Sequence, residues 1–265
     1  MTSEQSGPDA PVALVTGATS GIGYAIAQRL GRSGHRVYIC ARNADTLSVT
    51  LKELRAEGVD IDGTPADVRS TDEVRTLVSE AVRRYGPLSV LVNNAGRSGG
   101  GVTADIADQL WLDVIETNLN SVFRVTREAL TTGGMLAAGK GRVINIASTG
   151  GKQGVVLGAP YSASKHGVVG FTKALGLELA KTGITVNAVC PGYVETPMAQ
   201  RVREGYAQAW DVSVEQILER FEAKIPLGRY TAPDEVAAMV DYLVSEAAAP
   251  VTAQALNVCG GLGNY

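Results

Sequence analysis

The chain has 265 residues, of which 45% are hydrophobic and 19% charged, and its formal net charge at pH 7 is −3. This length allows one or two domains with a large core, and the negative charge argues against nucleic acid as a partner. No run of about eighteen apolar residues occurs, and residues 1–10 lack the basic and apolar regions of a signal peptide. We therefore expect a cytoplasmic protein with a flexible N-terminal tail at 1–10 and no membrane segment.

The cysteines and histidines exclude several classes of site. Cys40, Cys190 and Cys259 are odd in number, far apart and surrounded by apolar residues. Buried thiols in a reducing compartment are therefore expected, and disulfides or a zinc site are not. The only histidines are His35 and His166, and neither H-x-x-x-H nor G-x-S-x-G occurs. Metallohydrolase and serine-hydrolase functions are disfavoured, and no metal is expected.

Apolar, β-branched segments alternate with helical patterns along the whole chain. Strands are predicted at 12–16, 36–41, 60–66, 88–93, 142–147, 185–190 and 255–258, and helices near 22–33, 43–57, 71–85, 108–131, 160–181, 197–224 and 233–246. Repeated βα units predict one α/β domain over 11–265, a Rossmann-type doubly wound domain. Its seven-stranded, mostly parallel sheet would carry helices on both faces, with a lid insertion at about 192–226 before the last strand. Ligands bind beyond the carboxyl ends of such strands.

A glycine-rich segment, TGATSGIG at 16–23, follows the first predicted strand. Glycines allow a tight turn and let the backbone approach a pyrophosphate at a helix N-terminus. An ordinary glycine-rich turn is the alternative, but the strand before it and the helix after it favour nucleotide binding. The cofactor positions predicted here are Thr16, Gly17, Thr19, Ser20, Gly21, Ile22 and Gly23.

The next two strand ends indicate which nucleotide is bound. No acid for a ribose hydroxyl follows the second strand, which ends instead in Cys-Ala-Arg42-Asn. The guanidinium of Arg42 could accept a 2′-phosphate, so NADP(H) is predicted, although a solvated arginine at a helix start is the alternative. After the third strand, Asp67 and Val68 are placed to meet the adenine, and Asp67 could equally be a helix cap.

Polar residues at the fourth and fifth strand ends complete the predicted site. The segment Asn93-Asn94-Ala95-Gly96 has small residues that would let a cofactor lie across the sheet edge, and its asparagines could also tie loops together. Asn118 interrupts an apolar helical stripe, where a satisfied polar residue is the more common case. Ser148 follows the fifth strand and could donate to a substrate carbonyl, or serve as a cap.

Tyr161 and Lys165 lie four residues apart, so both project from one face of a helix that begins near Pro160. Tyrosine titrates near pH ~10, and one positive charge about 4 Å away would supply roughly 4 kcal/mol toward lowering that pKa. Desolvation of the phenolate would oppose the effect. The spacing alone is common on protein surfaces, but its position after Ser148 and a dinucleotide loop favours a catalytic pair.

In combination, these motifs resemble the short-chain dehydrogenase/reductase superfamily, in the same chain order over residues 12–265. Three longer runs resemble most closely the ketoreductases of type II (aromatic) polyketide synthases. They are ASTGGKQGVV at 147–156, YSASKHGVVGFTKAL at 161–175 and NVCGGLGNY at 257–265. The resemblance therefore implies reduction of a ketone by NADPH.

The resemblance also implies residue roles. Tyr161 would be the general acid that protonates the carbonyl oxygen, and Ser148 would orient the carbonyl. Lys165 would lower the pKa of the phenol and bind the nicotinamide ribose, and Asn118 would hold a water that links Lys165 to solvent. Further contacts to the cofactor are implied for Asn94, Ala95, Gly96, Tyr161, Pro191, Gly192, Val194 and Thr196.

The subfamily implies a polyketide substrate carried by an acyl carrier protein. Apolar and aromatic side chains of the lid suit a flat substrate, but they could instead only pack the lid onto the domain. Arg42, Arg69 and Arg97 follow strands at the ligand edge and could dock an acidic carrier protein, with a solvated charge as the alternative for each. Residues expected near the substrate or in the lid are Ser98, Gly99, Gly100, Gln153, Met198 and Tyr206.

Two features bear on assembly and product. Gly167, Gly170 and Gly176 each cost the predicted helix about 1 kcal/mol relative to alanine, which indicates close approach of another element. In the superfamily this helix packs across a subunit interface, so a homotetramer is expected, with packing on its own sheet as the alternative. The subfamily has Pro-Gly-Gly where this chain has Ser-Gly-Gly at 98–100, so the stereochemistry of the product is left open.

Three other functions are compatible with parts of the pattern. A 3-oxoacyl-[acyl-carrier-protein] reductase of fatty acid synthesis and another short-chain alcohol dehydrogenase would share the fold and the reacting groups. Substrate assays alone separate these from a polyketide reductase. A dinucleotide-binding sensor without activity predicts an incomplete Asn–Ser–Tyr–Lys set, and the set is complete here.

Overall fold

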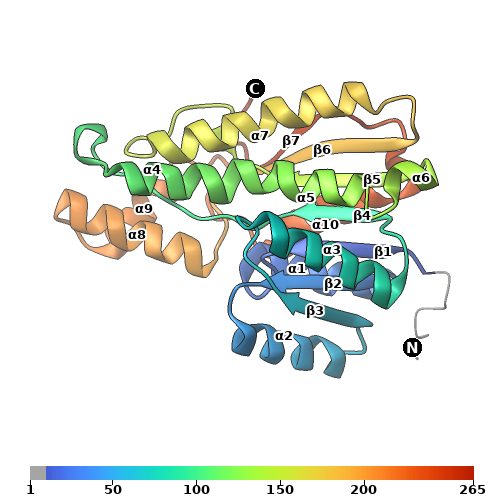
Figure 1. Ribbon diagram of the computed structural model, residues 1–265. Coiled ribbons are helices and arrows are strands. Elements are labelled where there is room, and N and C mark those ends of the chain that lie inside the picture. Colours follow the sequence, from blue (N-terminus) through green and yellow to red (C-terminus); the bar gives the residue numbers. More distant parts are fainter. Residues whose placement is uncertain (1–9) are drawn as a thin grey trace.

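The computed structural model describes residues 10–265, so residues 1–9 of the tail predicted at 1–10 lie outside the described residues. Seven strands form one sheet in the order β3-β2-β1-β4-β5-β6-β7, and every neighbouring pair is parallel (Figure 1). The predicted α/β fold is therefore confirmed, with a sheet that is parallel throughout. The strands are β1 (Val12–Thr16), β2 (Arg36–Ala41), β3 (Ile61–Pro65), β4 (Val90–Asn93), β5 (Gly141–Ile146), β6 (Ile184–Pro191) and β7 (Ala255–Val258).

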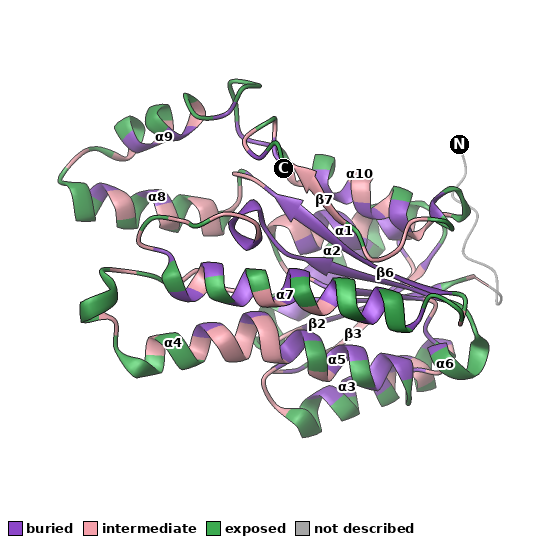
Figure 2. Cartoon of the chain, turned by 90° about the horizontal axis from the view of Figure 1, so that it is seen from above, coloured by how far each residue is buried: buried purple, intermediate pink, exposed green. Residues whose placement is uncertain are grey.

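Helices cover both faces of the sheet (Figures 1 and 2). One face packs against α1 (Gly21–Arg32), α2 (Ala44–Ala56) and α10 (Pro233–Val244), and the other against α3 (Thr71–Tyr85), α5 (Ser121–Leu130) and α7 (Ala159–Glu178). The central strands β1, β4, β5 and β6 are buried along their whole length because both faces are covered. The three cysteines lie buried and unpaired, as predicted. No helix within residues 10–265 combines the length and apolar character needed to cross a membrane.

Two predicted helices are interrupted. The stretch at 108–131 consists of α4 (Asp108–Ile115), a π turn at Glu116–Asn120, and α5. The stretch at 197–224 consists of α8 (Pro197–Trp210) and α9 (Val214–Glu222), because Asp211 adopts a φ of +51° and Ser213 begins a new helix with a capping box. Apolar periodicity continues across both breaks, so the sequence pattern did not indicate them.

The glycines of α7 have different surroundings. A Cβ at Gly176 would lie 2.7 Å from the backbone nitrogen of Ala253, and one at Gly167 would lie 2.7 Å from Leu119 Cδ2. Both glycines therefore allow close packing within the chain. A Cβ at Gly170 would meet nothing within 4 Å, so this part of α7 faces outward.

The segment between β6 and α10 extends beyond the carboxyl ends of the strands (Figure 1). Its helices α8 and α9 pack around an apolar cluster that includes Ala207, Ile217, Phe221, Ile225 and Tyr230. The predicted site residues also follow strand ends, so this helix pair stands beside the edge at which they gather.

Candidate active site

The loops after β1 and β4 are held together at the point where the strand order reverses. Asn94 Nδ2 donates to the carbonyls of Thr16 at 3.0 Å and Gly17 at 2.9 Å, and Thr16 Oγ1 accepts from the backbone N–H groups of Asn94 and Ala95. Gly17 has a φ of +64°, and a Cβ there would lie 2.8 Å from Ala95 Cα. Thr16 and Asn94 therefore tie the loops together, which was one of the two roles considered for the asparagine.

The glycine loop fits a dinucleotide. A Cβ at Gly23 would lie 2.3 Å from Asn94 Nδ2, and one at Gly21 would lie 3.1 Å from Thr196 Cγ2, so the loop is backed closely on two sides. The Ser20 side chain makes no cap hydrogen bond with the first turn of α1. The N-terminus of a twelve-residue helix and its backbone N–H groups therefore face the place where a pyrophosphate would lie.

Arg42 lies at the start of α2, just beyond the end of β2. It is exposed and forms no ion pair with any described residue, and the next residue, Asn43, caps the helix by accepting from Thr46 N at 2.9 Å. A guanidinium beside a helix N-terminus suits a phosphate group. Asp67 is instead occupied by Arg69, whose guanidinium approaches to 2.6 Å and lowers the pKa of that carboxyl. Ser70, and not Asp67, caps α3.

Ser148 and Tyr161 meet beyond the end of β5. Ser148 Oγ accepts from Gly150 N at 3.0 Å. A Cβ at Gly150 would lie 3.4 Å from Ser148 Oγ and 3.3 Å from Tyr161 Cε1, so both groups flank this glycine. Burial raises the pKa of Tyr161 above its ordinary value, and the nearby Ser148 hydroxyl opposes the increase. At neutral pH the phenol is therefore protonated, as a general acid must be.

Lys165 differs from the expectation that it lowers the pKa of the phenol. Its Nζ donates to the carbonyl of Ile146 at 2.8 Å and lies 5.9 Å from the centre of the Tyr161 ring. Burial lowers the pKa of Lys165 to about 8. Burial is the largest cause of both shifts, because the ammonium and the phenolate each lose hydration here.

Asn118 joins the loop after β4 to α7 from within the π turn. Only 1% of its surface is exposed. Its Oδ1 accepts from Arg97 N at 2.8 Å, and its Nδ2 donates to Arg97 O at 3.0 Å and to Ser164 Oγ at 3.1 Å. A Cβ at Gly96 would lie 3.4 Å from Asn118 Oδ1 and 3.8 Å from Lys165 Nζ. The structure therefore gathers Gly96, Asn118 and Lys165, and the asparagine side chain is fully hydrogen-bonded.

The residues expected near the substrate come from three adjoining segments. Gly101 N donates to Leu157 O at 2.8 Å, and a Cβ at Gly100 would lie 1.9 Å from that oxygen. Tyr206 on α8 donates its hydroxyl to Val156 O. The segment at 97–101, which includes Ser98 and Gly99, and helix α8 thus both contact the segment at 152–158. Gln153 and Met198 are partly buried.

The contacts of Val156 and Leu157 were missed by sequence reasoning. Leu157 adopts a φ of +57°, which its side chain does not signal.

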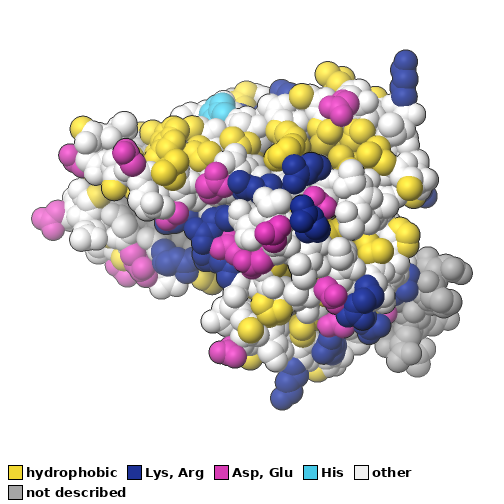
Figure 3. Space-filling model, viewed as in Figure 1, with side chains coloured by type: hydrophobic (Ala, Val, Ile, Leu, Met, Phe, Trp, Pro, Cys, Tyr) yellow, Lys and Arg dark blue, Asp and Glu magenta, His cyan; other side chains and the backbone are white. Residues whose placement is uncertain are grey.

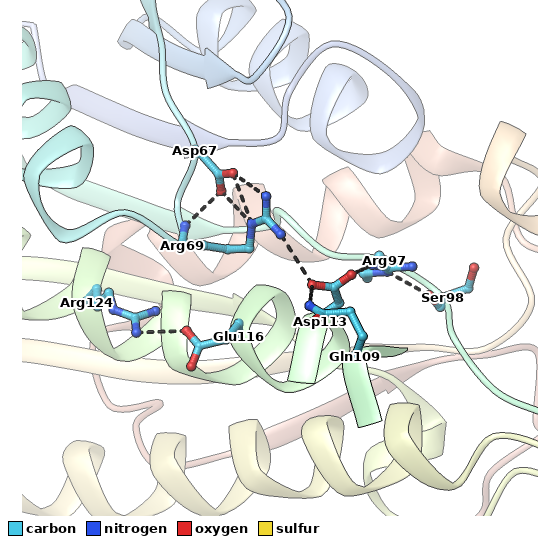
Figure 4. A network of polar contacts seen from close by, with 8 residues as sticks. All are labelled: Asp67, Arg69, Arg97, Ser98, Gln109, Asp113, Glu116 and Arg124. Carbon is cyan, nitrogen blue, oxygen red and sulfur yellow. Dashed lines mark hydrogen bonds and ion pairs between the residues drawn. The ribbon is translucent and has the colours of Figure 1, made fainter. Parts of the chain in front are cut away.

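The three arginines considered for docking have unequal surroundings, and Figure 4 shows two of them, Arg69 and Arg97, beside Asp113. Arg97 Nη1 lies 3.0 Å and Arg69 Nη1 3.5 Å from carboxylate oxygens of Asp113 on α4, whereas Arg42 stands apart. Asp113, which sequence reasoning missed, therefore offsets part of the positive charge of this patch. No group of three or more metal-ligating side chains forms anywhere in residues 10–265.

Comparison with known proteins agrees with this geometry. The sequence pattern of the family described as short chain dehydrogenase matches residues 11–207. The chain therefore belongs to the short-chain dehydrogenase family, a class of oxidoreductases built on the fold described above.

The chain is also similar to particular members of that family. A Streptomyces violaceoruber protein named as a ketoacyl reductase of the granaticin polyketide synthase is 68% identical over 96% of this chain and 94% of its own. A solved structure of an actinorhodin polyketide ketoreductase variant with NADPH is 67% identical, with a TM-score of 0.96 over 98% of this chain and 100% of its own. A 3-oxoacyl-[acyl-carrier-protein] reductase of Staphylococcus aureus is 38% identical over 94% of this chain and 97% of its own.

The burial of Lys165 predicts a pH-dependent stability. Its pKa is about 8 in the fold against an ordinary 10.5, so the unfolded chain holds this proton more tightly. Below pH 8 the full cost of the buried ammonium is present, and the cost disappears as the pH rises toward 10.5. Relative to Lys165→Met, the wild-type free energy of unfolding should therefore rise by up to about 3 kcal/mol across this window.

Urea unfolding at a series of pH values measures this difference. Lys173→Met, on the exposed side of α7, controls for the change in net charge. A pH-independent difference between wild type and Lys165→Met would contradict the prediction.

Proposed function

We propose that the protein is an NADPH-dependent ketoreductase that reduces a carbonyl of an acyl-carrier-protein-bound aromatic polyketide intermediate to a hydroxyl. The observation that carries the proposal is the meeting of Ser148, a protonated Tyr161 and the buried Lys165 at the sheet edge that holds the glycine loop. The names of the relatives at 67–68% identity support the polyketide substrate. Buried, unpaired cysteines suit a reducing compartment, which supports a cytoplasmic location.

The residues would divide the reaction as follows. NADPH, when bound, supplies a hydride to the carbonyl carbon. Tyr161 donates its phenolic proton to the carbonyl oxygen, which Ser148 holds by a hydrogen bond, so that an alcohol and a phenolate result. Lys165, whose Nζ lies 5.9 Å from the centre of the Tyr161 ring, would bind the nicotinamide ribose. Because the Asn118 side chain is occupied by Arg97 and Ser164, a water that returns the proton would bind the backbone of the π turn.

A polyketide substrate is favoured over the fatty acid alternative by two features. Identity to the reductase of the granaticin synthase is 68%, against 38% to the fatty acid type of reductase. In addition, Tyr206 lies against Trp210, with ring centres 4.8 Å apart, on the helix that contacts the segment before Tyr161. Flat aromatic side chains on a movable helix would suit a cyclic substrate. We therefore propose that the segment at 192–226 acts as the lid.

The reaction and substrate class are tested together by a panel of ketones. With NADPH, the wild type should reduce a bicyclic ketone such as a decalone faster than an acetoacetyl thioester. Tyr161→Phe should lower kcat/KM by roughly 10²–10⁴-fold, because it removes the acidic proton. Turnover of Tyr161→Phe at the wild-type rate would overturn the assigned acid. A preference for the linear thioester would instead favour the fatty acid alternative.

The preference for NADPH would depend on Arg42. A guanidinium that binds the 2′-phosphate by charge-assisted hydrogen bonds contributes about 1.5–3 kcal/mol, so Arg42→Ala should weaken NADPH binding by roughly 10–100-fold. NADH binding should change little, because NADH lacks this phosphate. Titration of cofactor fluorescence measures both affinities. Equal wild-type affinities for NADH and NADPH would contradict the assignment.

Carrier-protein docking at Arg69 and Arg97 is a separate proposal. Asp113 pairs with both arginines, so an incoming acidic surface would compete with it. Arg69→Ala and Arg97→Ala should raise KM severalfold for a carrier-bound substrate at saturating NADPH, and leave KM unchanged for a small free ketone. Arg83→Ala, an exposed arginine near the end of α3, is the control. Equal effects on both substrates would refute docking at this patch.

We also propose a homotetramer. Leu112, Phe123 and Leu177 expose 52%, 49% and 72% of their surfaces on α4, α5 and α7. Figure 3 shows hydrophobic side chains along the face formed by these helices, where Gly170 also leaves open space. Burial of such a face would stabilise an assembly. Sedimentation velocity should show a tetramer that Phe123→Asp shifts to smaller species, and a wild-type monomer would refute the proposal.

A further inference from the structure

A buried arginine in α8 forms an ion pair with a glutamate just before the helix. Arg203 is only 7% exposed, and its two terminal nitrogens lie 2.8 and 2.7 Å from the two carboxylate oxygens of Glu195. This is a bidentate pair, which fixes orientation as well as distance. The Glu195 side chain remains 53% exposed, so the carboxylate keeps part of its hydration while the guanidinium does not.

The pair is connected to the glycine loop through the residues on either side of Glu195. Glu195 stands between two residues predicted to contact the cofactor, Val194 and Thr196. Its N–H donates to Thr231 O at 3.0 Å, which pins this segment beside the start of α10. Thr196 then lies against the loop, because a Cβ at Gly21 would be 3.1 Å from Thr196 Cγ2.

The pair is also connected, through a series of aromatic rings, to the segment that precedes Tyr161. The Arg203 guanidinium lies 5.2 Å from the centre of the Tyr230 ring, which stacks on Tyr193 at 5.3 Å. Tyr193 stacks on Phe221 at 4.7 Å, and Phe221 meets Tyr206 edge-on at 5.3 Å. Tyr206 donates to Val156 O, in the segment that precedes Tyr161. A continuous set of contacts thus joins Gly21 to the entrance of α7.

We propose that the Glu195–Arg203 ion pair is a positioning link that couples occupancy of the nucleotide site to the placement of α8 over the substrate. A buried guanidinium that loses its carboxylate is strongly destabilised, so α8 must follow any shift of Glu195. A nucleotide that orders the 194–196 segment would thereby order α8. The substrate side of this inference rests on the proposed function.

The test compares Arg203→Lys and Glu195→Gln with a matched pair elsewhere. Lysine keeps the charge of Arg203 but cannot form the bidentate contact. Arg229 and Glu235 form a bidentate pair of closely similar lengths, 2.9 and 2.7 Å, on the surface, so Arg229→Lys is the control. NADPH affinity is measured by fluorescence titration, and hydrogen exchange of α8 is measured with and without NADPH.

In the wild type, NADPH should slow exchange in α8. Arg203→Lys and Glu195→Gln should each weaken NADPH binding roughly 5-fold or more and abolish this slowing, and the double variant should lose no more than either single variant. Arg229→Lys should change NADPH affinity by less than about twofold.

The link is refuted if either variant keeps wild-type affinity and NADPH-dependent protection of α8 while melting at a lower temperature, since the pair would then be merely structural. It is equally refuted if NADPH leaves wild-type α8 unprotected. If Arg203→Lys fails to fold, Glu195→Gln still tests the link, because Glu195 is half-exposed. None of these measurements uses a ketone, so a wild type that reduces no ketone would refute the proposed function alone.

Discussion

The tie between the loops after β1 and β4 is the contact on which the site depends. The strand order reverses between these neighbours, so their loops diverge and would leave an open crevice at the sheet edge. Asn94 bridges the two loops, and Gly17 allows the approach because it carries no side chain. This contact fixes the position of the glycine loop. The loop after β4 then continues to Gly96 and Arg97, and Asn118 is hydrogen-bonded to Arg97. One close approach thus connects the glycine loop to Asn118 and the candidate site around it.

Burial controls the charge of the reacting groups more than their mutual attraction does. The pKa of Tyr161 is raised and that of Lys165 is lowered to about 8, and desolvation is the main cause of both. At neutral pH the phenol is therefore protonated, and the ammonium holds its proton less tightly than an exposed lysine does. The Ile146 carbonyl at the end of β5 accepts a hydrogen bond from the Lys165 ammonium and offsets part of the cost of its burial.

The helix pair α8–α9 is the part of the structure with the fewest attachments to the sheet. It packs mainly on its own aromatic cluster, and it is joined to the rest by Arg203, by Tyr206 and by the bridge between Val194 and Thr231. Few attachments to the sheet mean that this unit can move with less loss of core packing than any sheet-covering helix.

The sequence by itself determined the fold class, the seven strands and the members of the candidate site, because apolar runs, glycine spacing and helix phase are local properties. Predicted strand bounds differ from the structure by at most two residues at any end. The sequence did not indicate the break at Asp211, where apolar periodicity continues across a left-handed residue. It also did not indicate the π turn at Asn118. The pairing of Asp113 with Arg69 and Arg97, and that of Glu195 with Arg203, depend on which helices the sheet brings together. The tertiary structure alone decided the ionisation of Tyr161 and Lys165, because a pKa depends on how completely water is excluded, and that depends on the whole fold.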